Sequence, residues 1–335
     1  MSSTKKLLST IITTSALSFG AATTATAAEP VCEIDRTINF SGASWESNLV
    51  LTDIHRFIVE KGYGCQTDVL PTETLPGLAA LERGDLDVNS EVWPNNYGTI
   101  WNEAVERGKV ISSGYLFSGY EAWYIPKYTQ ERFPDLKSIA DLPKYKDEFL
   151  DPETPGKGRF YGCPAGWNCE GVSANLFRAY NLGDTFTYYQ PGTGAAQKAA
   201  FSSEYRRQNN FVFYYWHPTP VSVSMDLVPL EMPEHDEELF ECLSRSDCDN
   251  PQPTGYPESP VFIALNKDFA EDAPQLKAFF DNNEMPLEVI SELLFKMEES
   301  GDDAYDMAMW FLNEHPEVWT KWVPEDVAER VQKSL

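Results

Sequence analysis

The sequence has little positive charge. It carries 26 Lys and Arg residues against 52 Asp and Glu residues, which gives a formal net charge of -26 at pH 7. A chain this acidic is repelled by nucleic-acid phosphates and by anionic membrane surfaces, so both are excluded as partners. The excess of acid indicates a solvated acidic surface rather than an electrostatic funnel for a cationic ligand.

The motifs of common hydrolases and metalloenzymes are also missing. His55, His217, His235 and His315 do not occur in H-E-x-x-H or H-x-H spacing, so a catalytic zinc ion lacks its ligands. There is no G-x-S-x-G motif and no glycine-rich loop for a phosphate. Residues 151–159 have the outline of a calcium loop, but Glu and Pro occupy its third and fifth positions, so the pattern leaves a metal site undecided.

Long apolar runs are absent beyond the N-terminus. Two lysines precede a run of apolar and small residues at 7–22, and an Ala-Thr-Ala cleavage site ends at Ala27. This pattern predicts a signal peptide over residues 1–28, cleaved near Ala27 or Ala28, and therefore export, most simply into a periplasm. No later segment approaches the roughly 20 apolar residues that cross a bilayer.

The six cysteines are spaced as disulfide partners rather than as metal ligands. Two pairs are separated by five residues each, Cys163 with Cys169 and Cys242 with Cys248, which leaves Cys32 with Cys65. Zinc ligands usually occur as C-x2-4-C with further Cys or His nearby, and no such pair is present. We therefore predict three disulfides in an oxidising compartment and no thiol nucleophile.

Apolar periodicity predicts alternating strands and helices that open with a βαβ unit. The expected elements are a strand at 37–40, a helix at 47–61 stopped by Gly62, a strand at 67–70, a helix at 75–83 and a strand at 84–93. Ligands bind beyond the carboxyl ends of parallel strands, so residues 41–46 and 93–97 are expected near a ligand.

A second unit is expected to begin near residue 119. It follows a strand at 110–116 and contains strands at 122–125 and 211–216. A further strand at 261–267 precedes four helical stretches, the last of which we expect to pack back on the first unit.

Four of the nine tryptophans lie on predicted loops at strand ends, where they line a cleft better than they fill a core. These are Trp45, Trp93, Trp167 and Trp216, whereas Trp310, Trp319 and Trp322 lie in C-terminal helices and are expected to be packing residues. A box of indole faces suits a fully methylated ammonium, which carries positive charge but no N–H to donate. At roughly 0.5–2 kcal/mol for each ring, three or four rings supply much of a micromolar affinity.

Trp167 lies inside the short Cys163–Cys169 loop. The disulfide is expected to fix the ring and to aim the backbone N–H groups of Asn168, Cys169 and Glu170 outward at the start of the next helix. A helix N-terminus is suited to the carboxylate or oxide of a ligand.

Three motifs resemble the periplasmic glycine betaine and proline betaine binding proteins of ABC importers. They are the disulfide loop GCPAGWNCEG at 162–171, which is specific, and VFYYWHP at 212–218 and EVWP at 91–94, which are moderately specific. The resemblance covers nearly the whole mature chain and implies an α/β, two-lobed periplasmic binding protein (type II) with the ligand cleft between the lobes. Lobe I would comprise residues 29–118 and 260–335, and lobe II residues 119–259.

The resemblance also implies a ligand site. The family's three-tryptophan box falls on Trp93, Trp167 and Trp216, and the backbone N–H groups of Asn168 and Cys169 would meet the ligand's anionic end. The family's histidine after the first box tryptophan is missing here, with Asn96 or Tyr97 as substitutes.

Trp45 and Glu46 are similar to an aromatic-acidic pair in choline binders of the wider family. They would add a fourth wall and a carboxylate to the site. Glu46 beside a ligand carboxylate would be costly unless it were protonated. This favours trimethylamine N-oxide or choline over glycine betaine.

The predicted function is that of a monomeric periplasmic solute-binding protein without catalysis or cofactor. It would capture a small trimethylated amine and deliver it to an ABC permease in the inner membrane. The alternative is a secreted enzyme that acts on a methylated amine, although its nucleophile or metal cluster is not evident. An acidic structural protein would leave the aromatic cluster unexplained.

Overall fold

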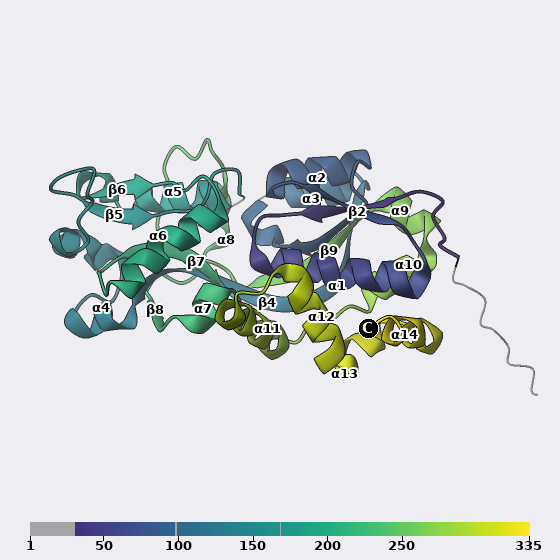
Figure 1. Ribbon diagram of the computed structural model, residues 1–335. Helices are drawn as coiled ribbons and strands as arrows, with labels where there is room; N and C mark the ends of the chain where they lie inside the picture. Colours follow the sequence, from purple (N-terminus) through teal and green to yellow (C-terminus); the bar gives the residue numbers. More distant parts are fainter. Residues whose placement is uncertain (1–30, 98, 168) are drawn as a thin grey trace, which may run out of the picture.

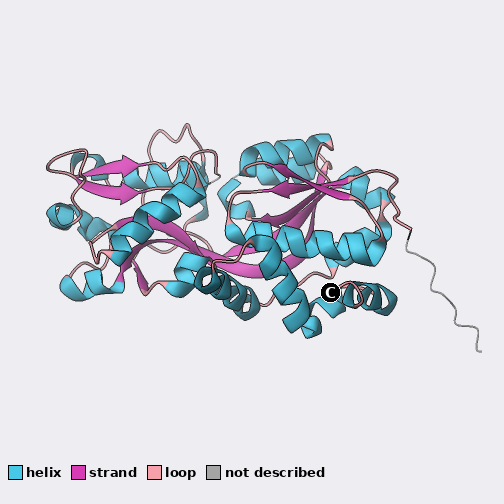
Figure 2. Ribbon diagram, in the orientation of Figure 1, coloured by secondary structure: helices cyan, strands magenta, loops and turns pink. Residues whose placement is uncertain are grey.

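The computed structural model describes residues 31–97, 99–167 and 169–335. The predicted signal peptide therefore lies outside the described residues. The described chain forms two lobes that share one nine-stranded sheet, with helices on both faces (Figures 1 and 2). The strand order is β2-β1-β3-β9-β4-β7-β5-β6, and β8 pairs with β4.

The first lobe holds the start of the sheet. Its strands are β1 (Ile38–Gly42), β2 (Thr67–Pro71), β3 (Val88–Val92), the first part of β4 (Val110–Pro126) and β9 (Ser259–Asn266). β1 is parallel to β2 and β3, whereas β9 runs antiparallel to β3 and β4. The second lobe contains the end of β4 with β5 (Gly158–Tyr161), β6 (Phe186–Tyr189), β7 (Val212–His217) and β8 (Leu227–Pro229).

β4 passes through both lobes as one 17-residue strand. Its residues up to Gly119 pair with β9, and those from Tyr120 onward pair with β7. The sequence predicted two separate strands here, at 110–116 and 122–125. In the structure Gly119 is required by close packing, since a Cβ there would lie 2.1 Å from the Trp93 ring. We propose the lobe boundaries at 118/119 and 259/260, next to the point at which the partner of β4 changes from β9 to β7.

The helices cover the sheet of each lobe. The first lobe has α1 (Glu46–Tyr63), α2 (Thr74–Arg83), η1 (Pro94–Tyr97), α3 (Thr99–Glu106), α9 (Lys267–Asp272) and α10 (Pro274–Asp281). The second has α4 (Lys127–Arg132), η2 (Ile139–Glu148), α5 (Cys169–Ala179), η3 (Leu182–Asp184), α6 (Gly194–Arg206), α7 (Pro220–Ser224) and α8 (Glu237–Ser244). In the first lobe α2 and α3 lie on one face of the sheet and α1 on the other (Figure 1).

The C-terminal helices touch both lobes. They are α11 (Leu287–Ser300), α12 (Ala304–Glu314), α13 (Pro316–Trp319), η4 (Thr320–Trp322) and α14 (Glu325–Gln332). α12 and α14 pack against α1, as expected from the sequence, but α11 packs against α7 of the second lobe. The C-terminal region is therefore not confined to the first lobe.

α1 ends later than the sequence suggested. It continues through Gly62 to Tyr63 and stops at Gly64, which has a φ of 71° and donates its N–H to the Glu60 carbonyl at 3.2 Å. Gly64 supplies the left-handed C-cap. Gly62 has a packing role instead, because a Cβ there would lie 2.6 Å from Val327 Cγ1 of α14.

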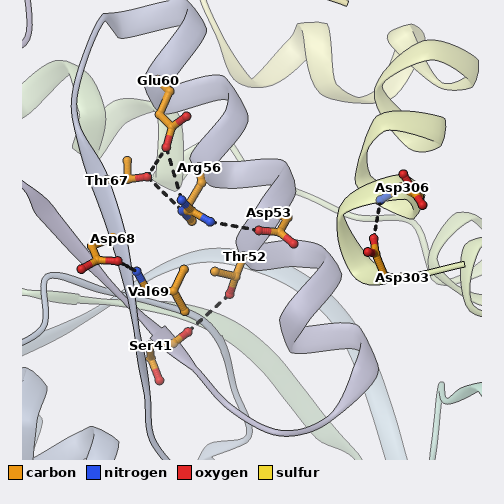
Figure 3. A network of polar contacts seen from close by, with 10 residues as sticks. All are labelled: Ser41, Thr52, Asp53, Arg56, Glu60, Thr67, Asp68, Val69, Asp303 and Asp306. Carbon is orange, nitrogen blue, oxygen red and sulfur yellow. Dashed lines mark hydrogen bonds and ion pairs between the residues drawn. The ribbon is translucent and has the colours of Figure 1, made fainter.

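Polar contacts tie α1 to the neighbouring strands (Figure 3). Arg56 donates from Nε to Thr67 Oγ1 of β2 at 2.9 Å and forms ion pairs with Asp53 at 3.2 Å and Glu60 at 3.4 Å. The contact of Arg56 with Thr67 therefore ties the middle of α1 to β2.

The three predicted disulfides are confirmed: Cys32–Cys65, Cys163–Cys169 and Cys242–Cys248. Among the described residues no cysteine is free. Within the same residues, none of the helices combines the length and the apolar character that crossing a membrane requires.

His55 lies in the core between α1 and the C-terminal region. Its Nδ1 is 3.0 Å from Ser90 Oγ, and its ring lies edge-on to Phe279, Phe280 and Trp322 at 5.8–6.3 Å between centroids. Burial lowers the pKa of His55 to about 3. The folded protein therefore holds this histidine neutral.

His55 should make the protein less stable in mild acid. Below a pH of about 6.5 the His55 imidazole takes up a proton in the unfolded chain but stays neutral in the folded protein. The free energy of unfolding therefore falls by about 1.4 kcal/mol for each pH unit between about 6.5 and 3. His55→Gln should have a flatter dependence of melting temperature on pH over this range, measured by calorimetry. His235→Gln is the control. An equal slope of melting temperature against pH in wild type and His55→Gln would contradict the role of His55 in this pH dependence.

Candidate functional site

Four indole rings converge where strands of the two lobes end. Trp45 is the N-cap of α1 after β1, Trp93 follows β3 directly, and Trp216 is the penultimate residue of β7. Trp167 lies in the disulfide loop before α5. Each of the four is between 5% and 8% exposed. The strand ends therefore bring together rings from four distant segments of the chain.

Trp167 is central to this cluster. Its ring meets Trp45 edge-on at 5.5 Å between centroids with an interplanar angle of 68°, and it meets Trp216 at 5.2 Å and 73°. Edge-to-face pairs are favourable for aromatic rings and leave ring faces open to a third group. Gly194 allows this arrangement, because a Cβ there would lie 2.9 Å from the Trp167 ring.

The rings enclose a small cavity. It is lined by Trp45, Thr74 and Trp93 from the first lobe, Trp167, Cys169, Tyr214 and Trp216 from the second, and Glu121 from β4. The space open to the centre of a water-sized sphere is about 30 Å³. This is roughly two to three times what one water molecule needs, so the cavity suits a ligand of few heavy atoms.

A carboxylate belongs to this cavity. Glu121 is 7% exposed, lies opposite Trp216 in the β4–β7 register, and accepts a hydrogen bond from the Tyr214 hydroxyl. Burial and the charge of Glu121 both raise the pKa of Tyr214 far above its ordinary value, so the phenol stays a donor. The cavity thus combines ring faces with one acidic side chain.

Sequence reasoning missed Thr74, Glu121 and Tyr214. Tyr214 had a usable signal, since it stands two residues before Trp216 and successive side chains of a strand alternate between faces. Glu121 follows Tyr120 and precedes Ala122 in the otherwise apolar stretch 120–125, where an acidic side chain needs a partner. Thr74 had no such signal, because only the tertiary fold brings the start of α2 to the cavity.

The disulfide loop is braced on several sides. The Glu170 carboxylate accepts the Gly166 N–H at 2.8 Å and the Gln190 Nε2–H at 2.7 Å. The Thr74 hydroxyl of the first lobe donates to the Gly166 carbonyl at 3.4 Å. Cys169, the first residue of α5, lines the cavity next to Trp167. Asn168, whose N–H was expected to bind the ligand, lies outside the described residues.

Two other predicted residues do not line the cavity. Tyr97 is buried in a second apolar cluster, where its ring lies 6.2 Å from Trp101 and its hydroxyl donates to the Thr74 carbonyl at 3.3 Å. Glu46 faces Lys198 of α6 rather than the cavity. The side chain of Asn96 lies outside the described part of the structure.

The calcium-like loop is closed by its own arginine. Arg159 Nη2 lies 2.5 Å from Asp151 Oδ1, and Thr187 donates to the other oxygen of the same carboxyl. Within the described ranges, no group of three or more acidic, His or Cys side chains is placed to hold a metal ion.

Comparison with known proteins identifies a family for this chain. Residues 36–314 match the family described as the substrate binding domain of ABC-type glycine betaine transport system. The chain belongs to this family. The family comprises substrate-binding domains of ABC transporters.

Several members of the family are similar along most of their length. The glycine betaine-binding periplasmic protein OusX of Dickeya dadantii is 27% identical over 259 residues, which are 74% of this chain and 76% of that protein. The trimethylamine N-oxide-binding protein of Pelagibacter ubique is 21% identical over 283 residues, 83% of this chain and 87% of that one.

A solved structure supports the fold. An ABC-transporter choline binding protein in complex with choline superposes with a TM-score of 0.72 at 18% identity, covering 89% of this chain and 97% of that one. The predicted α/β fold of a two-lobed periplasmic binding protein is therefore confirmed.

An ion-pair network joins the lobes of this family member beside the cage of indoles. Lys198 Nζ on α6 lies 3.1 Å from Glu46 Oε1 at the start of α1 and 2.6 Å from Glu298 Oε2 on α11. Burial lowers the pKa of Lys198, but the two carboxylates outweigh it and the net pKa is raised. Lys198 therefore stays charged and connects the second lobe to the residue next to Trp45.

Removal of this cation should weaken the contact between the two lobes. Lys198→Met keeps the aliphatic stem but loses both ion pairs, so a bound ligand should leave about three-fold to ten-fold faster. Stopped-flow fluorescence of the cage tryptophans measures the off-rate. Lys277→Met, which removes an ion pair within α10, is the matched control, and equal off-rates in all three proteins would refute the interlobe role.

Proposed function

We propose that this protein is a periplasmic, monomeric receptor that captures a small trimethylated amine in the indole cage and delivers it to an ABC permease in the inner membrane. The observation that carries the proposal is the cavity lined by Trp45, Trp93, Trp167 and Trp216 together with the carboxylate of Glu121. We infer that the preferred ligand is trimethylamine N-oxide or choline rather than glycine betaine.

Ring faces suit this class of ligand for a physical reason. A trimethylammonium group carries positive charge but no N–H, so hydrogen-bond acceptors alone cannot satisfy it. Each indole face attracts such a cation by about 0.5–2 kcal/mol, most strongly where water is excluded. The cage residues are almost fully buried. Aliphatic walls would also exclude water but would leave the charge uncompensated.

Glu121 supports the choice among trimethylated amines. Its carboxylate lies in the cavity wall, where it favours a cationic ligand and disfavours one that carries its own carboxylate. Cys169 brings the positive end of the α5 dipole to the same cavity, where it can accept the oxygen end of a small ligand. The small volume agrees with a compact molecule.

The related proteins point to the same chemical class. Their printed names include a glycine betaine-binding protein, a trimethylamine N-oxide-binding protein and a choline complex. These ligands share the trimethylammonium group and differ at the other end. The trimethylammonium group that these ligands share thus fits the aromatic cage. The polar part of the cavity wall is expected to select among the ligands.

Calorimetric titration tests the proposal. Trimethylamine N-oxide, choline, glycine betaine and dimethylsulfoniopropionate are titrated into the wild-type protein, and at least one of the first two should bind in the micromolar range or tighter. Trp167→Ala should weaken this binding about ten-fold to a hundred-fold, since it removes one ring face and the partner of two others. Trp310→Ala, an indole outside the cavity, is the control. Binding retained within a few-fold in Trp167→Ala would exclude the cage.

Glu121→Gln should change the selectivity. The amide keeps the shape of the side chain but removes its charge, so choline should bind about ten-fold more weakly while glycine betaine is spared or gains. The readout is the ratio of the two dissociation constants from the same titrations. An unchanged ratio would show that Glu121 does not act on the ligand's charge.

A further inference from the structure

A second carboxylate lies behind the cage. Glu91, on β3, is 1% exposed and does not line the cavity. Its Oε1 accepts the indole N–H of Trp93 at 2.7 Å and the Ser47 hydroxyl of α1 at 3.0 Å. One oxygen of this buried group therefore holds a cage ring and the first turn of the helix that follows Trp45.

The other oxygen of Glu91 has no hydrogen-bond partner among the described residues, and neither has the indole N–H of Trp45. Burial raises the pKa of Glu91 to about 7, although the hydrogen bonds from Trp93 and Ser47 lower it. One first-lobe indole, that of Trp93, thus presents its N–H edge to a buried carboxyl group.

This arrangement affects how the rings bind a cation. An indole N–H that donates to a carboxylate is polarised, and hydrogen bonds strengthen one another in a low-dielectric site. The ring then offers a more negative face to a cation. In addition, the buried charge itself attracts a cation across the ring with little screening.

We propose that Glu91 is a positioning residue that orients Trp93 and the first turn of α1 and makes the cage prefer a cation over an uncharged molecule of the same shape. This inference rests on the proposed function. Glu91 acts through the Trp93 ring and does not touch the ligand. A packing role alone would predict equal effects on charged and uncharged ligands.

Other ionisable groups near Glu91 need separate controls. On α1, Glu46 pairs with Lys198, and His55 contacts Ser90. On β4, Glu121 bonds to Tyr214 of β7 across the cavity. Of these, Glu121 is the second carboxylate at the cage, so the Glu121→Gln protein reports its share of any dependence on pH.

The test compares choline with neohexyl alcohol, its isostere in which a carbon replaces the ammonium nitrogen. At about pH 8.5, where Glu91 is ionised, Glu91→Gln should weaken choline binding about ten-fold and binding of the alcohol less than about two-fold. Gln keeps an oxygen for Trp93 but not the charge. Glu91→Asp, which retains the charge, should keep a preference for choline over the alcohol. Glu103→Gln, an exposed change on α3, should match wild type.

The dependence on pH gives a second readout. A bound cation favours the ionised form of Glu91, so in wild type the ratio of choline affinity to alcohol affinity should fall as the pH falls from about 8.5 to 5.5. This decrease should be lost in Glu91→Gln but kept in Glu121→Gln. Equal losses for choline and the alcohol, or a wild-type pH profile in Glu91→Gln, would overturn the inference. If wild type binds no trimethylated amine at all, the proposed function fails instead.

Discussion

The aromatic cage depends on one constraint: rings from two lobes must face a single dry cavity. A trimethylammonium ion has no proton to donate, so ring faces are the groups that can compensate its charge. Trp45 and Trp93 come from one lobe, and Trp167 and Trp216 from the other. The rest of the fold can be understood as the means of holding these rings together.

The supports of the cage are charges and small residues. Gly119 and Gly194 let Trp93 and Trp167 approach the backbone, which no larger residue would permit. Lys198 joins the lobes beside Trp45 through two carboxylates. Glu121 places a carboxyl group in the cavity wall, and Glu91 places another behind it. In an acidic protein these carboxylates are distinguished from the surface ones by burial, which raises the energetic effect of each charge.

Sequence reasoning succeeded where the signal is local. The βαβ start, the disulfide pairs and the four loop tryptophans follow from periodicity, spacing and position at strand ends. It failed where a residue has a non-local role. Gly62 was read as the end of a helix but accommodates α14, and the strands predicted at 110–116 and 122–125 are one strand in which Gly119 accommodates Trp93. The contact of Glu46 with Lys198, which lies 152 residues away, was likewise not predicted.

The amino-acid sequence by itself determined the aromatic character of the candidate site. Tryptophans after strands, a short disulfide loop and the lack of nucleophiles or metal ligands indicate a binding protein for a methylated cation. Only the tertiary structure decided which polar groups accompany the rings. Thr74, Glu121, Tyr214 and Glu91 lie on elements far apart in the chain, and a buried carboxylate is recognisable only once its partners and its lack of solvent are known.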